Sequence, residues 1–154
     1  SVSGEELGLW GSDHFAEHPT WPLDKIVADI NIDMIGRLTQ GAGDNEIQVT
    51  PTYQHAQYST LVRNASEVAA RMGMSFTNGD QYYERSDHFN FARKGVPVVF
   101  FCNGEHPDYH KASDEVAKLD FAKLERVARL AYWTGVEVIR AKGRPERLGS
   151  RSSW

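Results

Sequence analysis

The sequence predicts an α/β fold in which a mostly parallel sheet is covered by helices on both faces. Residues 96–101 form a near-continuous apolar run, typical of a strand buried on both sides. Residues 26–34 alternate apolar and polar side chains, which indicates a strand with one packed face. Residues 57–72 and 121–141 repeat apolar side chains at the three- and four-residue spacing of amphipathic helices. Strands that alternate with helices favour this fold class.

The remaining elements of the first half are short. Residues 5–18 predict a turn that passes into a short helix. Pro19 and Pro22 end this helix, because proline lacks a backbone donor and restricts the residue before it. A turn over residues 41–45 then leads into a short strand over residues 46–50.

The second half alternates polar connections with regular elements. Residues 75–80 form a short polar segment. A brief helix is predicted over residues 86–93, and residues 103–115 form a polar loop. Asp120 is placed to cap the last helix. We assign residues 1–141 to one domain and residues 142–154 to a frayed polar tail.

Composition excludes several classes of partner. The net charge of −4 provides no basic patch for nucleic acid or an anionic membrane. The sequence has no apolar run of about 18 residues, the length needed to span a bilayer. Cys102 is the single cysteine, so it is either a buried thiol or a catalytic one. Ser1 to Gly4 contain neither an initiator Met nor a signal peptide, and we expect an N-terminal piece to precede them.

Polar residues that follow predicted strands are the candidates for chemistry, because ligands of α/β sheets bind beyond the carboxyl ends of strands. Glu5 and Glu6 are adjacent acids at the start of a helix. They are either solvated carboxylates favoured by the helix dipole, or a metal ligand beside a general base. Asp33 ends the strand over residues 26–34 and is either a ligand or a turn residue.

Two further clusters carry titratable side chains. Residues 103–110 contain two histidines, two acids and a tyrosine, and histidine is the commonest metal ligand, although a loop histidine can also be merely exposed. Ser86, Asp87 and His88 have the residue types of a Ser-His-Asp hydrolase. No Gly-x-Ser-x-Gly elbow surrounds this serine, which disfavours that alternative.

The order of the motifs is more specific than any one of them. The chain reads SGEELGLWGS from residue 3, NIDMIGR from residue 31, SDHF from residue 86, GVP from residue 95 and DYH from residue 108, with Asp114 after it. In this combination the chain resembles the M28 family of metallopeptidases, the aminopeptidase and glutamate-carboxypeptidase-like group. The resemblance covers residues 3 to about 140.

This resemblance implies the C-terminal portion of a three-layer αβα catalytic domain that cleaves peptides with two zinc ions. It implies Glu5 as the general base and Tyr109 as the donor to the oxyanion. It implies Glu6 and His110 as ligands of one zinc and Asp33 as a ligand of the other. Ser86, Asp87 and His88 resemble the wall of the substrate pocket. A secreted or periplasmic location rests on the resemblance alone.

The chain departs from the family pattern upstream of the Glu5–Glu6 pair. Family members supply a histidine and a bridging aspartate there, and residues 1–4 contain neither. His14 and His18 are conceivable substitutes, although they follow the pair. We therefore expect a longer protein, and the resemblance implies that it is a zinc exopeptidase of the aminopeptidase type. The alternatives are a metal-depleted, peptidase-like non-catalytic module and a glutaminyl-cyclase-like transferase with a single zinc.

Overall fold

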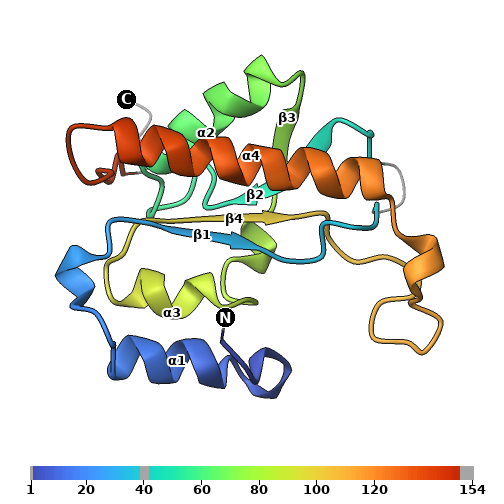
Figure 1. Cartoon of the computed structure of the whole chain (residues 1–154), viewed down its shortest axis with the longest axis horizontal. Coiled ribbons are helices and arrows are strands. Elements are labelled where there is room, and N and C mark those ends of the chain that lie inside the picture. The colour runs from blue at the N-terminus through green and yellow to red at the C-terminus, as the bar shows by residue number, and fades with distance from the viewer. Residues whose placement is uncertain (1, 39–41, 150–154) are drawn as a thin grey trace.

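The computed structural model describes residues 2–38 and 42–149, and Figure 1 shows their arrangement. Gly41 of the predicted turn and the last five residues of the predicted tail lie outside the described residues. A sheet of four strands in the order β1-β4-β2-β3 forms the centre of the molecule, with helices above and below it. The predicted α/β class is confirmed.

The sheet is mixed. Strand β1 (Asp29–Ile32) pairs in parallel with β4 (Val98–Cys102). Strand β2 (Glu46–Thr50) pairs in parallel with β3 (Ser75–Asn78). The two pairs are joined by an antiparallel contact between β2 and β4 that sets Val49 opposite Phe101. The sheet is thus mostly parallel, with one antiparallel junction at its centre.

Strand β4 is the core of the sheet. All five of its residues are buried, as the apolar run predicts. Val99 and Phe101 belong to the large hydrophobic cluster on one face, whereas Val98 packs with Tyr83 and Ala92 on the other. The period-two geometry of a strand sends alternate side chains to opposite faces, so a strand at this position must be apolar throughout.

Helices cover both faces of the sheet. Helices α2 (Thr60–Arg71) and α4 (Phe121–Arg140) lie on one face, and α3 (His88–Arg93) lies on the other. Helix α1 (Trp10–Glu17) packs on the outer side of α3, where the rings of Phe15 and Phe91 are 5.7 Å apart (Figure 1). Among the described residues, no helix is both long enough and apolar enough to cross a membrane.

Short 3₁₀ helices occupy several connections. They are η1 (Glu5–Leu7), η2 (Leu23–Lys25), η3 (Asp80–Tyr82) and η4 (Val116–Lys118). The turn and the short helix predicted over residues 5–18 correspond to η1 and α1. The predicted strand over residues 26–34 is shorter, because η2 holds the chain out of the sheet until residue 29.

Two expectations at the ends of helices have different outcomes. Asp120 caps α4 as predicted, accepting a hydrogen bond of 2.9 Å from the backbone N–H of Lys123. The start of the predicted tail is not frayed: the N–H of Leu148 donates to the carbonyl of Tyr58 at 2.8 Å. These backbone pairs attach residues 146–148 to the segment before α2.

Candidate active site

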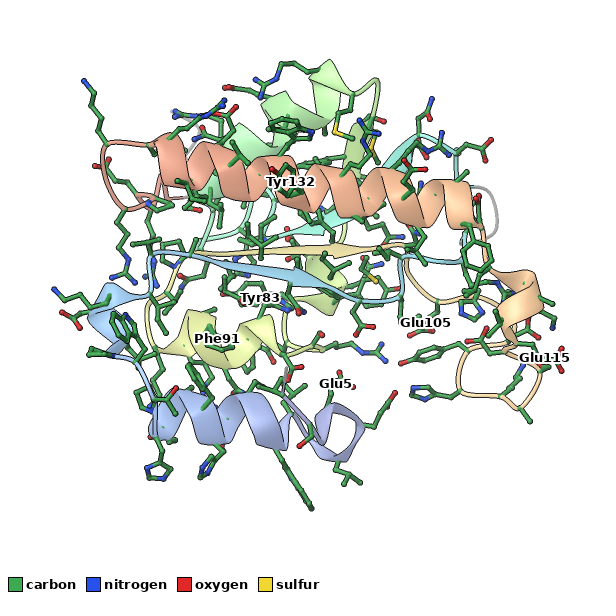
Figure 2. All side chains as sticks on the ribbon, viewed as in Figure 1. Glu5, Tyr83, Phe91, Glu105, Glu115 and Tyr132 are labelled. Carbon is green, nitrogen blue, oxygen red and sulfur yellow. The ribbon has the colours of Figure 1, made fainter. Side chains whose placement is uncertain are left out.

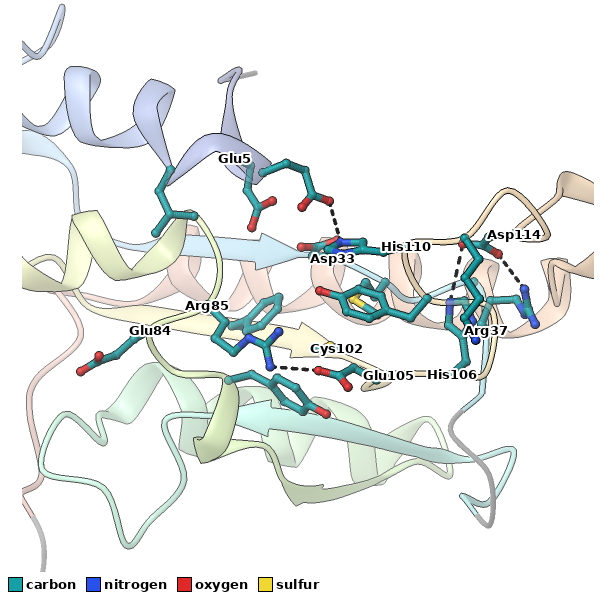
Figure 3. A pocket seen from close by; sticks show the side chains of 18 of the residues that line it. Glu5, Asp33, Arg37, Glu84, Arg85, Cys102, Glu105, His106, His110 and Asp114 are labelled. Atoms are coloured by element: carbon teal, nitrogen blue, oxygen red, sulfur yellow. Dashed lines mark hydrogen bonds and ion pairs between the residues drawn. The ribbon is translucent and has the colours of Figure 1, made fainter.

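A cleft with a volume of about 690 Å³ opens at the carboxyl ends of β1 and β4. Four segments of the chain line it: η1 with the residues just after it, the residues after β1, the end of η3 with the residues after it, and β4 with the loop that follows (Figure 3). They include all five of the residues predicted for catalysis and metal binding, which are Glu5, Glu6, Asp33, Tyr109 and His110. Glu5 and Glu105 both lie on the α1–α3 side of the sheet (Figure 2). The sheet edge thus brings together what the sequence separates.

The turn that presents Glu5 and Glu6 depends on a close backbone approach. A Cβ atom at Gly11 would lie 2.4 Å from both the nitrogen and the oxygen of Ser3, so only glycine fits. The N–H of Gly11 donates to the carbonyl of Ser3 at 2.8 Å. This contact fixes the chain before η1 against the start of α1 and holds the two carboxylates at the cleft.

Backbone strain is concentrated at the cleft. Among the described residues, the non-glycine residues with positive φ are Leu9, Met34 and His110, at 60°, 54° and 57°. All three line the cleft. Such conformations are costly for residues with a Cβ and persist where the surrounding structure holds them, often at functional sites. The strain is independent support for a function at this position.

Glu6 and His110, two of the predicted metal ligands, lie in direct contact. Glu6 Oε1 lies 3.1 Å from His110 Nε2, and both side chains are largely exposed. The ring of Tyr109 stacks on that of His110, with centroids 3.9 Å apart. A carboxylate and an imidazole are donors that zinc accepts. No three such residues gather into a metal site within residues 2–38 and 42–149, so these residues offer only part of a zinc coordination shell.

Asp33 is supported from beneath by a chain of hydrogen bonds. The hydroxyl of Ser86 donates to Asp33 Oδ2 at 3.2 Å, and the Asn31 amide donates to Ser86 Oγ at 2.9 Å. The same amide lies 3.4 Å from His88 Nδ1, and the His88 ring stacks on Phe100. Ser86 is 3% exposed and His88 is fully buried.

This arrangement bears on two predictions made for the SDH motif. Ser86, Asp87 and His88 lie behind the surface of the cleft and are not among its lining residues, so their contact with substrate stays a prediction. Because the hydroxyl of Ser86 donates to Asp33, it is not directed at His88 as the Ser-His-Asp alternative requires.

The electrostatics of the cleft affect Glu5 most clearly. Partial burial raises the pKa of Glu5, and the carboxylates of Asp33, Glu6 and Asp87 raise it further. The nearby His110 opposes this shift. A carboxylate with a raised pKa accepts a proton more readily, which suits a general base.

Arg37 attaches the loop that carries Tyr109 and His110 to the end of β1. Its guanidinium donates to Asp108 and to Asp114, each at 2.7 Å. Hydrogen bonds to Asp108, the strongest effect coming from Arg37 and smaller ones from Lys118 and Ser113, hold the pKa of this carboxyl well below its usual range. The loop is thereby fixed from a residue four positions after Asp33.

Several residues of the cleft were missed by the sequence analysis. Tyr82, Glu84 and Arg85, from the end of η3 and the residues after it, were not candidates, whereas Glu105 and His106 belong to the predicted cluster of residues 103–110 but were given no individual role. Their signal was weak, because they are ordinary polar residues flanking the SDH motif or sharing a loop with His110.

Other candidate residues have settings that do not support a role in the chemistry. Burial raises the pKa of the Cys102 thiol to about 11, which keeps it protonated and unreactive. His14 and His18 lie exposed on α1 with their rings 5.0 Å apart, and neither lines the cleft.

Comparison with known proteins identifies the family. Residues 1–134 match Peptidase family M28, and the chain belongs to this family. It is 24% identical over 155 residues to aminopeptidase YwaD of Bacillus subtilis. This alignment covers 96% of this chain and 33% of YwaD. A probable leucine aminopeptidase of Arthroderma benhamiae is 26% identical over 150 residues, covering 88% of this chain and 37% of that protein. The chain thus spans about a third of the length of the curated relatives it matches.

Solved structures share the fold. The LapA aminopeptidase of Legionella pneumophila superposes with a TM-score of 0.78 at 22% identity, over 92% of this chain and 38% of that chain. BSAP, a zinc aminopeptidase from Bacillus subtilis, gives a TM-score of 0.72 at 25% identity, over 94% of this chain and 36% of that chain. A glutaminyl cyclase of Porphyromonas gingivalis gives a TM-score of 0.65 at 19% identity, over 89% of this chain and 51% of that chain.

Proposed function

We propose that the protein carrying this chain is a zinc-dependent exopeptidase of the aminopeptidase type, with Glu5 as its general base. One observation carries the proposal: Glu5, Glu6, Asp33, Tyr109 and His110 line a single cleft in a chain of the M28 family. The names of the relatives agree, since YwaD is an aminopeptidase and BSAP a zinc aminopeptidase.

Each residue then has a task that its setting supports. Glu5, whose pKa is raised, takes a proton from the attacking water and returns it to the leaving amine. The hydroxyl of Tyr109, on the same cleft, donates to the oxyanion that develops on the scissile carbonyl. The acidic wall formed by Glu6 and Asp33 also suits the ammonium group at the start of a peptide.

Glu6 and His110 would hold one zinc ion, and Asp33 would contribute to a second. When bound, zinc supplies Lewis-acid polarisation of the carbonyl and makes water more acidic. Because the described residues complete neither shell, further donors are needed.

A single substitution tests the role of Glu5. The protein, expressed with whatever sequence its gene encodes on either side, is assayed on a panel of aminoacyl-p-nitroanilides, and its zinc content is measured. Glu5→Gln is expected to lower kcat by about 10²- to 10⁴-fold, as for loss of a general base, with zinc content unchanged. Glu84→Gln is the matched control, because Glu84 lines the same cleft without a proposed task. Full activity of Glu5→Gln contradicts the role.

The two alternatives are separated by metal stoichiometry. A glutaminyl-cyclase-like transferase is favoured by the shared fold and would bind one zinc and cyclise an N-terminal glutaminyl peptide. A non-catalytic module would bind no zinc and cleave nothing. Two zinc ions together with release of free amino acids exclude both.

A further inference from the structure

Arg85 places a cationic group on the wall of a cleft whose lining is rich in carboxylates. It precedes the SDH motif and lines the cleft on the side away from η1, which supplies Glu5 and Glu6 (Figure 3). A cleft with carboxylates at one side and a guanidinium at another matches a ligand that carries an ammonium and a carboxylate together.

The other cations of the cleft are already engaged. Arg37 is held by two carboxylates at 2.7 Å, and its side chain is 16% exposed. The ammonium of Lys111 donates to the carbonyl of Pro107 at 2.6 Å. Neither group is free to receive a ligand without breaking the structure of the loop.

Arg85 is bound less firmly. Within the part of the chain that the structure describes, its one carboxylate partner is Glu105 at 2.9 Å, and the two side chains are 51% and 46% exposed. Ion pairs this exposed to water contribute little to stability, so an incoming carboxylate can displace Glu105. Arginine is also the side chain that best matches the planar geometry of a carboxylate.

The guanidinium is nonetheless held in place. It lies over the ring of Tyr82, 5.7 Å from the centroid, and Tyr109 is close enough to interact with it electrostatically. Two aromatic neighbours therefore fix its position beside a residue that the proposed reaction uses. A group positioned in advance loses less conformational entropy when it binds a ligand.

We propose that Arg85 receives a carboxylate of the substrate in exchange for Glu105, so that the enzyme prefers short peptides bearing a free carboxylate beyond the scissile bond. This inference rests on the proposed function. The carboxylate is either the C-terminus of a dipeptide or an acidic side chain after the cleaved bond, and Arg85 recognises the same chemistry in both.

Two matched pairs of substrates test the proposal and distinguish the two sources. Leu-Ala is compared with Leu-Ala amide for the terminal carboxylate, and Leu-Glu amide with Leu-Gln amide for the side chain. The wild-type ratio of kcat/KM is expected to favour the acid in at least one pair by about tenfold, as for one charge-assisted contact. Arg85→Gln is expected to bring that ratio close to one.

Two further variants keep the test independent of the folding of Arg85→Gln. Glu105→Gln removes the competing carboxylate and is expected to increase the ratio. Arg93→Gln is the matched control, because Arg93 is an exposed arginine on α3, outside the lining of the cleft, and should leave the ratio unchanged. If every variant gives the same kcat/KM ratio as the wild type, the proposal is overturned.

Failure of the proposed function has a different signature. A wild-type protein that cleaves none of the four peptides contradicts the exopeptidase assignment. Calorimetric titration of the same peptides then tests Arg85 by binding alone, with the same expected order of the variants. Equal dissociation constants within each pair overturn the role of Arg85 without reference to catalysis.

Discussion

Glu6 and His110 are separated by 104 positions in the sequence, yet their side chains meet with Glu6 Oε1 3.1 Å from His110 Nε2. Glu6 comes from η1, and His110, whose own φ is positive, comes from the loop after β4. Both side chains are exposed, so this contact adds little to stability. The proposed zinc site requires these two side chains to lie close together.

His110→Ala is expected to reduce the zinc content of the protein, because it removes one of the two donors that meet at this point. The loss of affinity should exceed the roughly 10- to 100-fold effect of changing only a group behind a ligand. Zinc measured after dialysis against a graded chelator series checks this. His14→Ala is the control, since His14 is exposed on α1 away from the cleft. Equal zinc retention in both variants contradicts the assignment.

Arg37→Met is expected to loosen the loop that carries Tyr109 and His110. Its guanidinium bridges two acids that are 71 and 77 positions away, and no other group described here replaces that bridge. Hydrogen exchange across residues 106–114 should accelerate, and zinc affinity should fall by about tenfold. Arg71→Met provides the comparison, because Arg71 makes a similar ion pair to Glu137 at 2.9 Å far from the cleft. Unaltered exchange in the loop would refute the anchoring role.

Ser86→Ala is expected to leave Asp33 without the hydroxyl that orients it. Zinc affinity should fall by about 10- to 100-fold, as found for groups that position ligands. Ser59→Ala deletes an equally buried hydroxyl at the start of α2 and should leave zinc binding unchanged. Competition with a colorimetric chelator measures both. Similar zinc affinities in the two variants would mean that Ser86 serves packing alone.

Local patterns were enough to predict most of the fold. Strand β4 and helices α2 and α4 were predicted from their periodicity, because each buries a regular face against the same core. Strand β3 was missed because Ser75–Asn78 is an edge strand with few apolar side chains, fixed by its pairing with β2. The antiparallel contact of β2 with β4 was equally invisible, since periodicity does not specify which strand lies beside which.

The residues of the site that stand in family motifs could be predicted from the sequence. The contacts that hold those residues in place could not. Glu5, Glu6, Asp33 and His110 stand in recognisable motifs, and all four line the cleft. Arg37 stands in one of those motifs, but its partners are set by tertiary structure and no local pattern marks them. The position of Ser86 beneath Asp33 likewise follows from the packing of α3 on the sheet.

Asp29, which is partly buried, and His88, which is fully buried, have opposite effects on the pH dependence of stability. Burial, followed by the charge of Asp87, raises the pKa of Asp29 from 3.8 to about 7. Between these values the folded protein keeps a proton that the unfolded chain has lost, so the free energy of unfolding falls as pH rises. Burial lowers the pKa of His88 from 6.5 to about 4. There the unfolded chain holds the extra proton, so stability is lost as pH falls through this interval.

Between about pH 4 and 6.5, Asp29 and His88 change the free energy of unfolding in opposite directions as pH rises. Removing one group by substitution should therefore reveal the pH dependence due to the other. Relative to wild type, Asp29→Asn is expected to gain stability steadily as pH rises from about 4 to about 7. His88→Gln, relative to wild type, is expected to lose stability as pH rises across the same interval. Urea unfolding of both variants and of the double variant checks this, and the double variant should run parallel to wild type. Single-variant profiles that also run parallel to wild type would show that neither group changes its proton occupancy on folding.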